Sequence, residues 1–185
     1  MKKAAWLLLA VLLLTGCTGK RQELDRAMGL RAKLLASGCS FRAEVTADYG
    51  QQLYTFTMDC RGQPQGDLEF TVTGPDTISG ITGIASEKGG VLTFDETALE
   101  FPLLADGQIS PVSAPWILFR TLRGGYLSSV GEEDGLLRLS IDDSYADDAL
   151  RLDIWLDGQD QPIRGEILYA GRRILTVLVT EFHIL

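Results

Sequence analysis

His183 is the single histidine of this 185-residue chain, and it stands two residues from the C-terminus. One imidazole cannot build a histidine metal cluster, and a serine–histidine–aspartate triad would depend on a terminal segment that usually frays. The sequence also contains no GxSxG, HExxH, GxxxxGK[ST] or GxGxxG motif. We therefore expect no catalytic residue, no metal site and no cofactor.

Acidic residues gather in two places, at 132–134 (EED) and at 142–148 (DDSYADD). Two carboxylates that face each other across a cleft could serve glycoside hydrolysis, and carboxylate oxygens could hold calcium. However, DDSYADD departs from the D-x-[DN]-x-[DN]-G pattern of a calcium loop. We interpret both segments as solvated loops at strand ends, with calcium binding and catalysis as the alternatives.

Cys17 closes a segment with the layout of a secretory signal. Lys2 and Lys3 precede an uncharged apolar run over 4–14, which is too short to span a membrane. The residues Leu14-Thr15-Gly16-Cys17 look like a bacterial lipobox. This resemblance implies cleavage before Cys17 and a diacylglycerol on its thiol, which would anchor the chain to a membrane. The alternative is an ordinary cleaved signal with an incidental cysteine.

The expected organisation is a signal peptide over 1–16, a lipidated N-terminus and short tether over 17–22, and one domain over 23–185. Loss of Lys2 and Lys3 changes the formal charge from −8 to −8 − 2 = −10. A domain with this charge is repelled by phosphate backbones, so we expect no nucleic-acid partner. The lipobox predicts an extracytoplasmic location on the bacterial cell membrane.

Cys39 and Cys60 remain as an even pair in that location. The segment between them, FRAEVTADYGQQLYTFTMD, alternates in the manner of two strands, with Tyr49-Gly50 as the expected turn. A two-residue turn there places Cys39 directly opposite Cys60, on a non-hydrogen-bonded pair with Cα atoms about 4.5 Å apart. We predict a disulfide, with two reduced, half-buried thiols as the alternative.

Hydrophobic periodicity predicts an α+β domain. An amphipathic helix is expected over 20–37, where the apolar residues recur at helical spacing, and it ends near Gly38. A second helix is expected over 113–123, capped by Ser113 and ended by Gly124-Gly125. Strands are expected in the remaining chain, at 41–47, 54–58, 67–73, 77–86, 91–95, 98–101, 136–141, 149–156, 162–169 and 173–182. The last four form an antiparallel meander.

The second helix and the last hairpin carry the residues that we consider for a partner or ligand surface. These residues are Trp116, Phe119, Arg120, Arg123, Arg172 and Arg173. Core packing is the favoured interpretation of the two aromatic residues and of Trp155, with a ligand-lining or partner-binding patch as the alternative. For the arginines, surface ion pairs are favoured over the docking of an acidic partner.

A lipid-anchored chain with one long curved sheet and two or three helices resembles the LolA-like superfamily of lipoprotein carriers and periplasmic sensors. The resemblance is one of layout and covers most of residues 20–185. It implies a large curved antiparallel sheet, a half-open barrel, that wraps the helices around an apolar interior. It also implies binding in place of catalysis.

Three stretches carry a narrower resemblance: ADGQISPVSAPWILFRTLRGGY (105–126), DDSYADDALRLDIWLD (142–157) and EILYAGRRILTVLV (166–179). They look like the spore-germination lipoproteins of the GerS family. This resemblance implies a non-enzymatic adaptor for a cell-wall N-acetylmuramoyl-L-alanine amidase, which would allow muramic-δ-lactam to form in the spore cortex. It also implies a location on a spore membrane that faces the cortex.

A second hypothesis is a lipid or lipoprotein carrier that holds an acyl chain, a hydrophobic ligand, in the concave sheet. Two features argue against it. A lipidated protein stays on its membrane, and the large apolar residues appear numerous enough to fill the interior. A hydrolase is the third and least favoured hypothesis.

Overall fold

A computed structural model describes residues 16–105, 108–146 and 149–185. The predicted signal peptide therefore lies, apart from its last residue, outside the described residues. Most of the described chain forms one antiparallel sheet of eleven strands in the order β6-β5-β4-β3-β2-β1-β13-β12-β11-β10-β9. The strands are β1 (Cys39–Asp48), β2 (Leu53–Gly62), β3 (Leu68–Gly74), β4 (Thr82–Ser86), β5 (Gly89–Phe94), β6 (Thr97–Phe101), β9 (Tyr126–Glu133), β10 (Leu136–Asp142), β11 (Arg151–Leu156), β12 (Pro162–Tyr169) and β13 (Arg172–Ile184).

The first and last strands pair with each other in the middle of this sheet. β1 pairs with β13, and the register places Val45 opposite Val177. Each half is otherwise a simple meander of sequential neighbours. The predicted meander of the last four strands is confirmed, and the structure adds β9 and the short pair β7 (Leu104–Ala105) and β8 (Gln108–Ile109).

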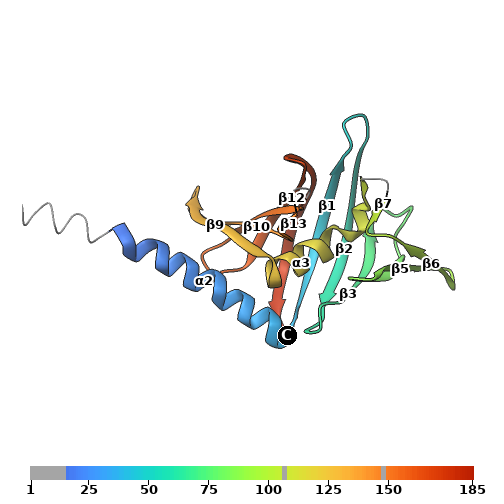
Figure 1. Ribbon diagram of the computed structural model, residues 1–185. Helices are drawn as coiled ribbons and strands as arrows, with labels where there is room; N and C mark the ends of the chain where they lie inside the picture. The colour runs from blue at the N-terminus through green and yellow to red at the C-terminus, as the bar shows by residue number, and fades with distance from the viewer. Residues whose placement is uncertain (1–15, 106–107, 147–148) are drawn as a thin grey trace, which may run out of the picture.

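Two helices lie on the concave face of the sheet (Figure 1). They are α2 (Gly16–Ser37) and α3 (Ala114–Gly124), the latter preceded by the 3₁₀ turn η1 (Pro111–Ser113). This arrangement confirms the predicted α+β class with a large curved antiparallel sheet. Among the described residues, neither helix combines the length and apolar character that a membrane crossing requires.

The first helix is longer than expected and less completely packed. α2 includes residues 17–22, which the sequence analysis assigned to a tether, and it ends as predicted before Gly38, whose φ is +76°. Of its apolar residues, Ala27, Leu30 and Leu34 are buried against the sheet. Three of its large apolar residues are exposed to solvent: Leu24, Met28 and Leu35.

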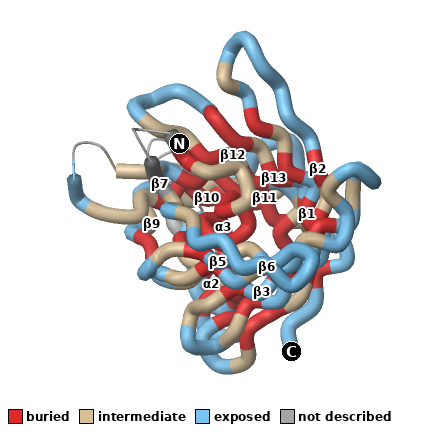
Figure 2. Tube along the Cα trace, turned by 90° about the vertical axis from the view of Figure 1, so that its right-hand side faces the viewer, coloured by how far each residue is buried: buried red, intermediate tan, exposed pale blue. Residues whose placement is uncertain are grey.

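α3 approaches the sheet closely because glycines lie beneath it. A Cβ at Gly62 of β2 would be 2.6 Å from the ring of Phe119, and one at Gly165 of β12 would be 2.6 Å from Leu118. Ser113 lies at the predicted N-cap position, but its hydroxyl donates to the carbonyl of Ser110 at 2.6 Å and makes no capping hydrogen bond to the helix. Figure 2 shows the buried residues gathered along α3 and the central strands.

The β1–β2 register differs from the prediction by two residues. Asp48 pairs with Leu53 across a four-residue connection, whereas we expected a two-residue turn at Tyr49-Gly50. Val45 consequently lies opposite Phe56 and not opposite Tyr54. A shift of two residues leaves every side chain on its expected face, so hydrophobic alternation cannot distinguish the two registers.

Candidate functional site

The predicted disulfide is absent from the structure. Cys39 lies opposite Gly62 and Cys60 lies opposite Phe41, so the two cysteines are diagonal neighbours on the inner face. Both are free, buried thiols. Burial raises the pKa of Cys39 to about 12, and burial together with the nearby Cys39 and Asp59 raises that of Cys60 well above its usual value. Neither thiol is poised for nucleophilic chemistry, because the thiolate is the reactive form.

The aromatic residues of α3 belong to the core and cannot form an exposed partner surface. Trp116 and Phe119 keep only 4% and 1% of their surface exposed, and the indole of Trp116 donates to the carbonyl of Gly66 at 3.1 Å. Core packing, the favoured interpretation, is therefore correct for both. Trp155 lies on the outer face between the guanidinium groups of Arg138 and Arg164, which are 5.2 and 4.9 Å from its ring.

The arginines of α3 serve the fold. Arg120 contacts the carboxylates of Glu87 and Asp143 at 3.3 and 3.8 Å. Arg123 stacks on the ring of Phe119 with its guanidinium carbon 5.0 Å from the centroid, and it donates to the carbonyl of Pro64. These contacts agree with the favoured interpretation of intramolecular pairing, and 38% of the Arg120 side chain remains exposed.

The two arginines of the last hairpin differ from each other. Arg173 donates to Glu166 at 2.9 Å on the outer face of the sheet. Arg172 is exposed at the β12–β13 turn. Of the six residues considered for a partner or ligand surface, Arg172 and Arg173 are exposed and belong to β13, whereas the other four belong to α3.

The groups considered for catalysis or metal binding are dispersed. His183 is exposed on β13, opposite Ser40. Asp142 accepts a hydrogen bond from Arg151 at 2.9 Å. Within the described ranges, no three histidine, cysteine or acidic side chains are grouped so that they could hold a metal ion.

An apolar pocket of about 720 Å³ opens on the concave face beyond the N-terminal end of α3. This volume lies within the range of small-molecule sites. We call it the open pocket. Among the residues that the structure describes, the lining contains no charged side chain and comprises Tyr49, Tyr54, Phe56, Val72, Ile78, Ile81, Leu92, Phe101, Pro102, Ile109, Ser110, Pro111 and Val112.

The tyrosine hydroxyls at the open pocket are already hydrogen-bonded within the chain. The phenol of Tyr49 donates to the carbonyl of Ile109 at 2.7 Å, and that of Tyr54 donates to the side chain of Gln52. Burial, and secondarily the neighbouring Tyr54, raises the pKa of Tyr49. The open pocket therefore offers apolar surface and shape to an occupant.

Glycines on the inner face reduce the side-chain volume above this end of the sheet. Cβ atoms at Gly83 and Gly90 would lie 2.5 and 2.1 Å from the rings of Phe70 and Phe101, so those rings lie across the glycines. α3 covers the middle of the sheet and does not extend over β5 and β6 (Figure 1). The open pocket results from these two features: the strands beneath it contain glycines, and α3 ends before it reaches β5 and β6.

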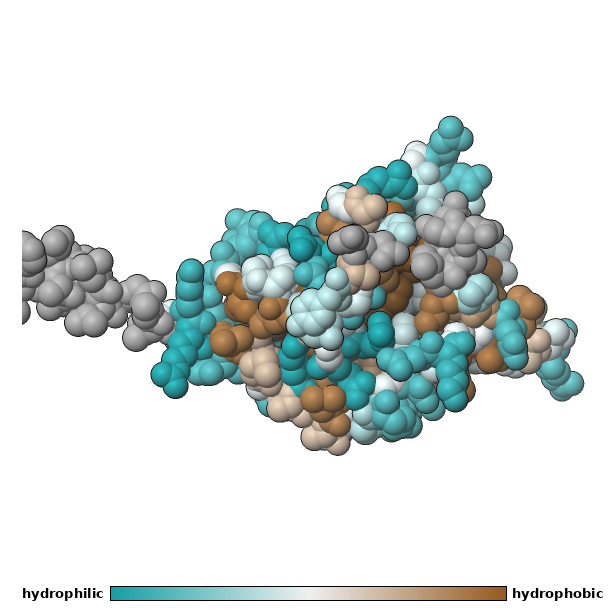
Figure 3. Space-filling model, in the orientation of Figure 1, coloured by the Kyte–Doolittle hydropathy of each residue, from teal (hydrophilic) through white to brown (hydrophobic). Residues whose placement is uncertain are grey.

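Apolar surface continues from the open pocket along the β5–β6 hairpin. Leu92 pairs with Leu99, and Phe94 falls on the same face two residues further along β5. Phe94 is 56% and Leu99 63% exposed, which is unusual for large apolar side chains on a concave face. Figure 3 shows apolar residues reaching the surface around β5 and β6, at the right of the view.

Our sequence analysis did not identify these lining residues. A signal was present in VLTFDETALEF (91–101), where large apolar residues recur at a spacing of two in both arms of a hairpin, at Leu92 and Phe94 and at Leu99 and Phe101. Alternation predicts one apolar face for each arm, but it does not state whether a helix covers that face.

No protein-family model matches the chain, and no curated protein matches it. Solved structures similar to this one include a LolA superfamily protein from Nitrosomonas europaea, at 7% identity and a TM-score of 0.46 over 90% of this chain and 93% of that one. A putative outer membrane lipoprotein-sorting protein domain from Vibrio parahaemolyticus has 9% sequence identity and a TM-score of 0.47, over 89% of this chain and 92% of that one. A chain from the complex of the CwlD amidase with the GerS lipoprotein of Clostridioides difficile has 13% sequence identity and a TM-score of 0.42, over 87% of this chain and 95% of that one. The similarity to each is one of overall fold.

Proposed function

We propose that this protein is a non-enzymatic, lipid-anchored extracytoplasmic lipoprotein that holds an apolar group of another molecule in the open pocket. The observation that carries the proposal is the pocket itself: about 720 Å³ with an uncharged lining whose tyrosine hydroxyls are already bonded within the chain. A protein that buries most of its apolar surface gains nothing in stability from leaving such a patch open, so the patch marks a binding site.

Attachment to the membrane rests on the lipobox and Cys17. Replacement of Cys17 by serine removes the thiol that would carry the diacylglycerol. The variant should leave the membrane fraction, and the mass of the mature wild-type chain should exceed the sequence mass by that of the lipid. A mature chain of unmodified mass would contradict the anchor.

We further propose that the occupant is supplied by a cell-wall N-acetylmuramoyl-L-alanine amidase of the spore cortex, for which this protein would be the adaptor. The proposal is supported by the resemblance of residues 105–126, 142–157 and 166–179 to the GerS family. The first stretch contains Ile109 to Val112, which line the open pocket.

The second candidate function is that of a carrier or receiver of acyl chains in the same pocket. Large residues were expected to fill the interior, whereas the structure leaves an open apolar volume. This observation removes one of the two arguments against a carrier.

One pair of variants tests the role of the open pocket. Leu92→Gln places an amide in the lining, and Ile84→Gln makes the same type of change on the outer face of neighbouring β4, where Ile84 is 50% exposed. We expect Leu92→Gln, and not Ile84→Gln, to abolish capture of the amidase from sporulating cells. Native mass spectrometry of the purified protein distinguishes the second candidate, which requires co-purified lipid that Leu92→Gln loses. If both variants retain every bound molecule, the open pocket is not the binding site.

A further inference from the structure

The connections around the open pocket carry charge of one sign. The β1–β2 connection supplies Tyr49 to the lining, the β3–β4 connection supplies Ile78 and Ile81, and the β5–β6 turn follows directly on Phe94. Residues 48–53, 74–81 and 94–97 together contain four acidic residues and no lysine or arginine. These acids are Asp48, Asp76, Asp95 and Glu96, and all of them are exposed.

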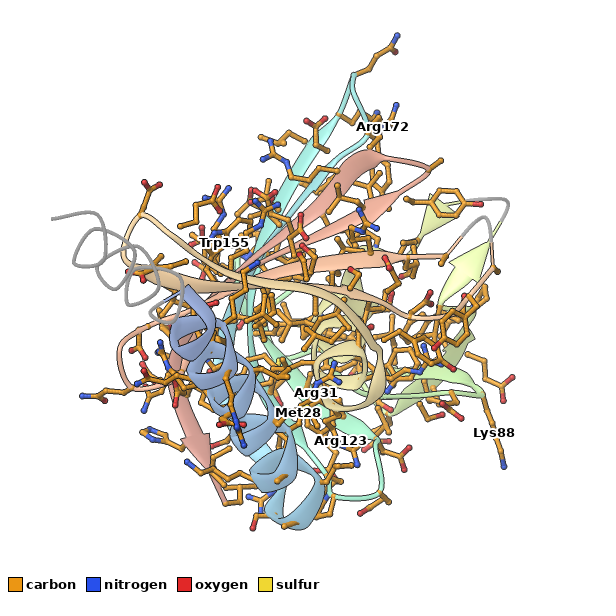
Figure 4. All side chains as sticks on the ribbon, turned by 60° about the vertical axis from the view of Figure 1, so that its left-hand side comes forward. Met28, Arg31, Lys88, Arg123, Trp155 and Arg172 are labelled. Carbon is orange, nitrogen blue, oxygen red and sulfur yellow. The ribbon has the colours of Figure 1, made fainter. Side chains whose placement is uncertain are left out.

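The imbalance extends well beyond these turns. Between residues 43 and 119 the chain has eleven aspartates and glutamates but only Arg61 and Lys88 as basic residues. Arg61 lies on the outer face of β2, opposite Glu69. Lys88 lies at the β4–β5 turn and extends away from the body of the protein (Figure 4). Arg172 belongs to the β12–β13 turn, and it is not part of the lining.

An anionic occupant would meet this rim at a cost. Fatty acids and anionic phospholipids place their negative charge at the end of the apolar chain, and that end would lie among the exposed carboxylates when the chain is in the pocket. Charge complementarity instead favours an apolar group that has positive charges beside it, because complementary potentials raise association rates and disfavour wrong partners.

The sheet edge beside the open pocket supplies a second recognition element. β6 is the terminal strand of the sheet, and within the part of the chain that the structure describes it pairs only with β5. Its other edge therefore presents backbone amides and carbonyls, which can accept an extended segment as an additional strand. Leu99 and Phe101 of β6 face the same side as the open pocket, so alternate side chains of an added strand would fall on apolar surface.

We propose that the open pocket and the edge of β6 dock an extended apolar segment of a partner protein that carries lysine or arginine next to its apolar residues. The inference rests on the proposed function and specifies the chemistry of the partner. The apolar side chains of the segment occupy the open pocket and the apolar surface that Phe94 and Leu99 form beside it. The backbone of the segment pairs with β6, and its basic residues lie beside Asp95 and Glu96.

Matched peptides test the inference with the full chain held in nanodiscs of zwitterionic phosphatidylcholine, with empty nanodiscs as the blank. The first probe is a labelled peptide of alternating leucine and threonine that ends in lysines, and the second has glutamates in place of the lysines. Fluorescence anisotropy should show that the lysine peptide binds roughly tenfold or more tightly at low salt, with the difference shrinking as salt screens the charges. The lysine peptide should lose binding when alternate amides on its pairing edge are N-methylated.

Charge variants of the protein locate the effect. Asp76→Asn, Asp95→Asn and Glu96→Gln together should bring the affinities of the two peptides together. The control removes the same number of exposed acids elsewhere, with Asp25→Asn on α2, Glu44→Gln on β1 and Glu132→Gln on β9. This control should preserve the preference for lysine.

The outcomes separate the inference from the proposed function. Equal binding of both peptides, or a preference for lysine that the rim variants leave unchanged, would overturn the inference while the open pocket remained a binding site. Binding of dodecanoate that Leu92→Gln abolishes, without binding of the lysine peptide, would overturn it in favour of the acyl-chain carrier. Failure of every probe to bind would contradict the proposed function as well.

Discussion

The phenol of Tyr49 donates a hydrogen bond to the carbonyl oxygen of Ile109 at 2.7 Å, across sixty residues of sequence. Both residues line the open pocket. The bond ties the β1–β2 connection to the segment that leads into α3, and it thereby fixes one wall of the pocket. It also explains why Tyr49 is drawn out of the tight turn that the sequence suggested.

Tyr49→Phe should lower the free energy of unfolding by about 1 kcal/mol, because the carbonyl of Ile109 loses its donor while the ring remains. Chemical denaturation measures the change. Tyr54→Phe is the matched control, since the Tyr54 hydroxyl bonds only to the side chain of Gln52 in an exposed position. A loss for Tyr54→Phe as large as that for Tyr49→Phe would contradict the structural role of the Tyr49–Ile109 bond.

Gly62→Ala should destabilise the protein by roughly 1–3 kcal/mol, because the new methyl group would lie 2.6 Å from the ring of Phe119 and force α3 away from β2. Gly29→Ala provides the opposite case. A Cβ at Gly29 of α2 would contact nothing within 4 Å, so alanine should stabilise the helix by about 0.5–1 kcal/mol. Thermal unfolding of the two variants should shift the midpoint in opposite directions.

The buried thiols should make the fold sensitive to alkaline pH. Burial raises the pKa of Cys39 from its ordinary value of 9.0 to about 12, so the unfolded chain loses this proton at lower pH than the folded one does. The stability from this group is complete below pH 9 and is lost as pH rises toward 12. At pH 10 the loss should be about 1 kcal/mol.

Cys39→Ala isolates this contribution. Between pH 8 and pH 10 the variant should lose about 1 kcal/mol less free energy of unfolding than the wild type, measured by denaturant unfolding at each pH. The native wild-type thiols should also react slowly with a thiol reagent until the protein unfolds. Rapid labelling of Cys39 in the folded protein would show that this thiol is accessible and would remove the basis of the prediction.

The β5–β6 turn contains two non-glycine residues with positive φ, Asp95 at 47° and Glu96 at 63°. Asn-Gly is the preferred sequence for a turn in which both central residues have positive φ. Asp95→Asn combined with Glu96→Gly should therefore raise the free energy of unfolding by about 1 kcal/mol. Asp95→Asn with Glu96→Ala removes the same charges but retains the backbone strain, and it should show no such gain.

Residues with strong local signals were predicted well. The end of α2 at Gly38, the end of α3 at Gly124-Gly125 and the last four strands follow from periodicity and from glycine positions, and the structure confirms them. The hairpin register was not predicted, because Val45 keeps its inward face whether it lies opposite Tyr54 or Phe56. The predicted disulfide depended on that register, and in the observed register the two cysteines are diagonal neighbours with free thiols.

The sequence by itself determined the α+β class, the apolar face of each strand and the acidic character of residues 43–119, because each of these depends on neighbouring residues along the chain. Only the tertiary structure decided that β13 joins β1, that α3 covers the middle of the sheet, and that Leu92, Leu99 and Phe101 remain open to solvent. An apolar strand face has the same sequence pattern whether or not a helix covers it. Its exposure depends on how far a helix distant in the sequence extends across the sheet.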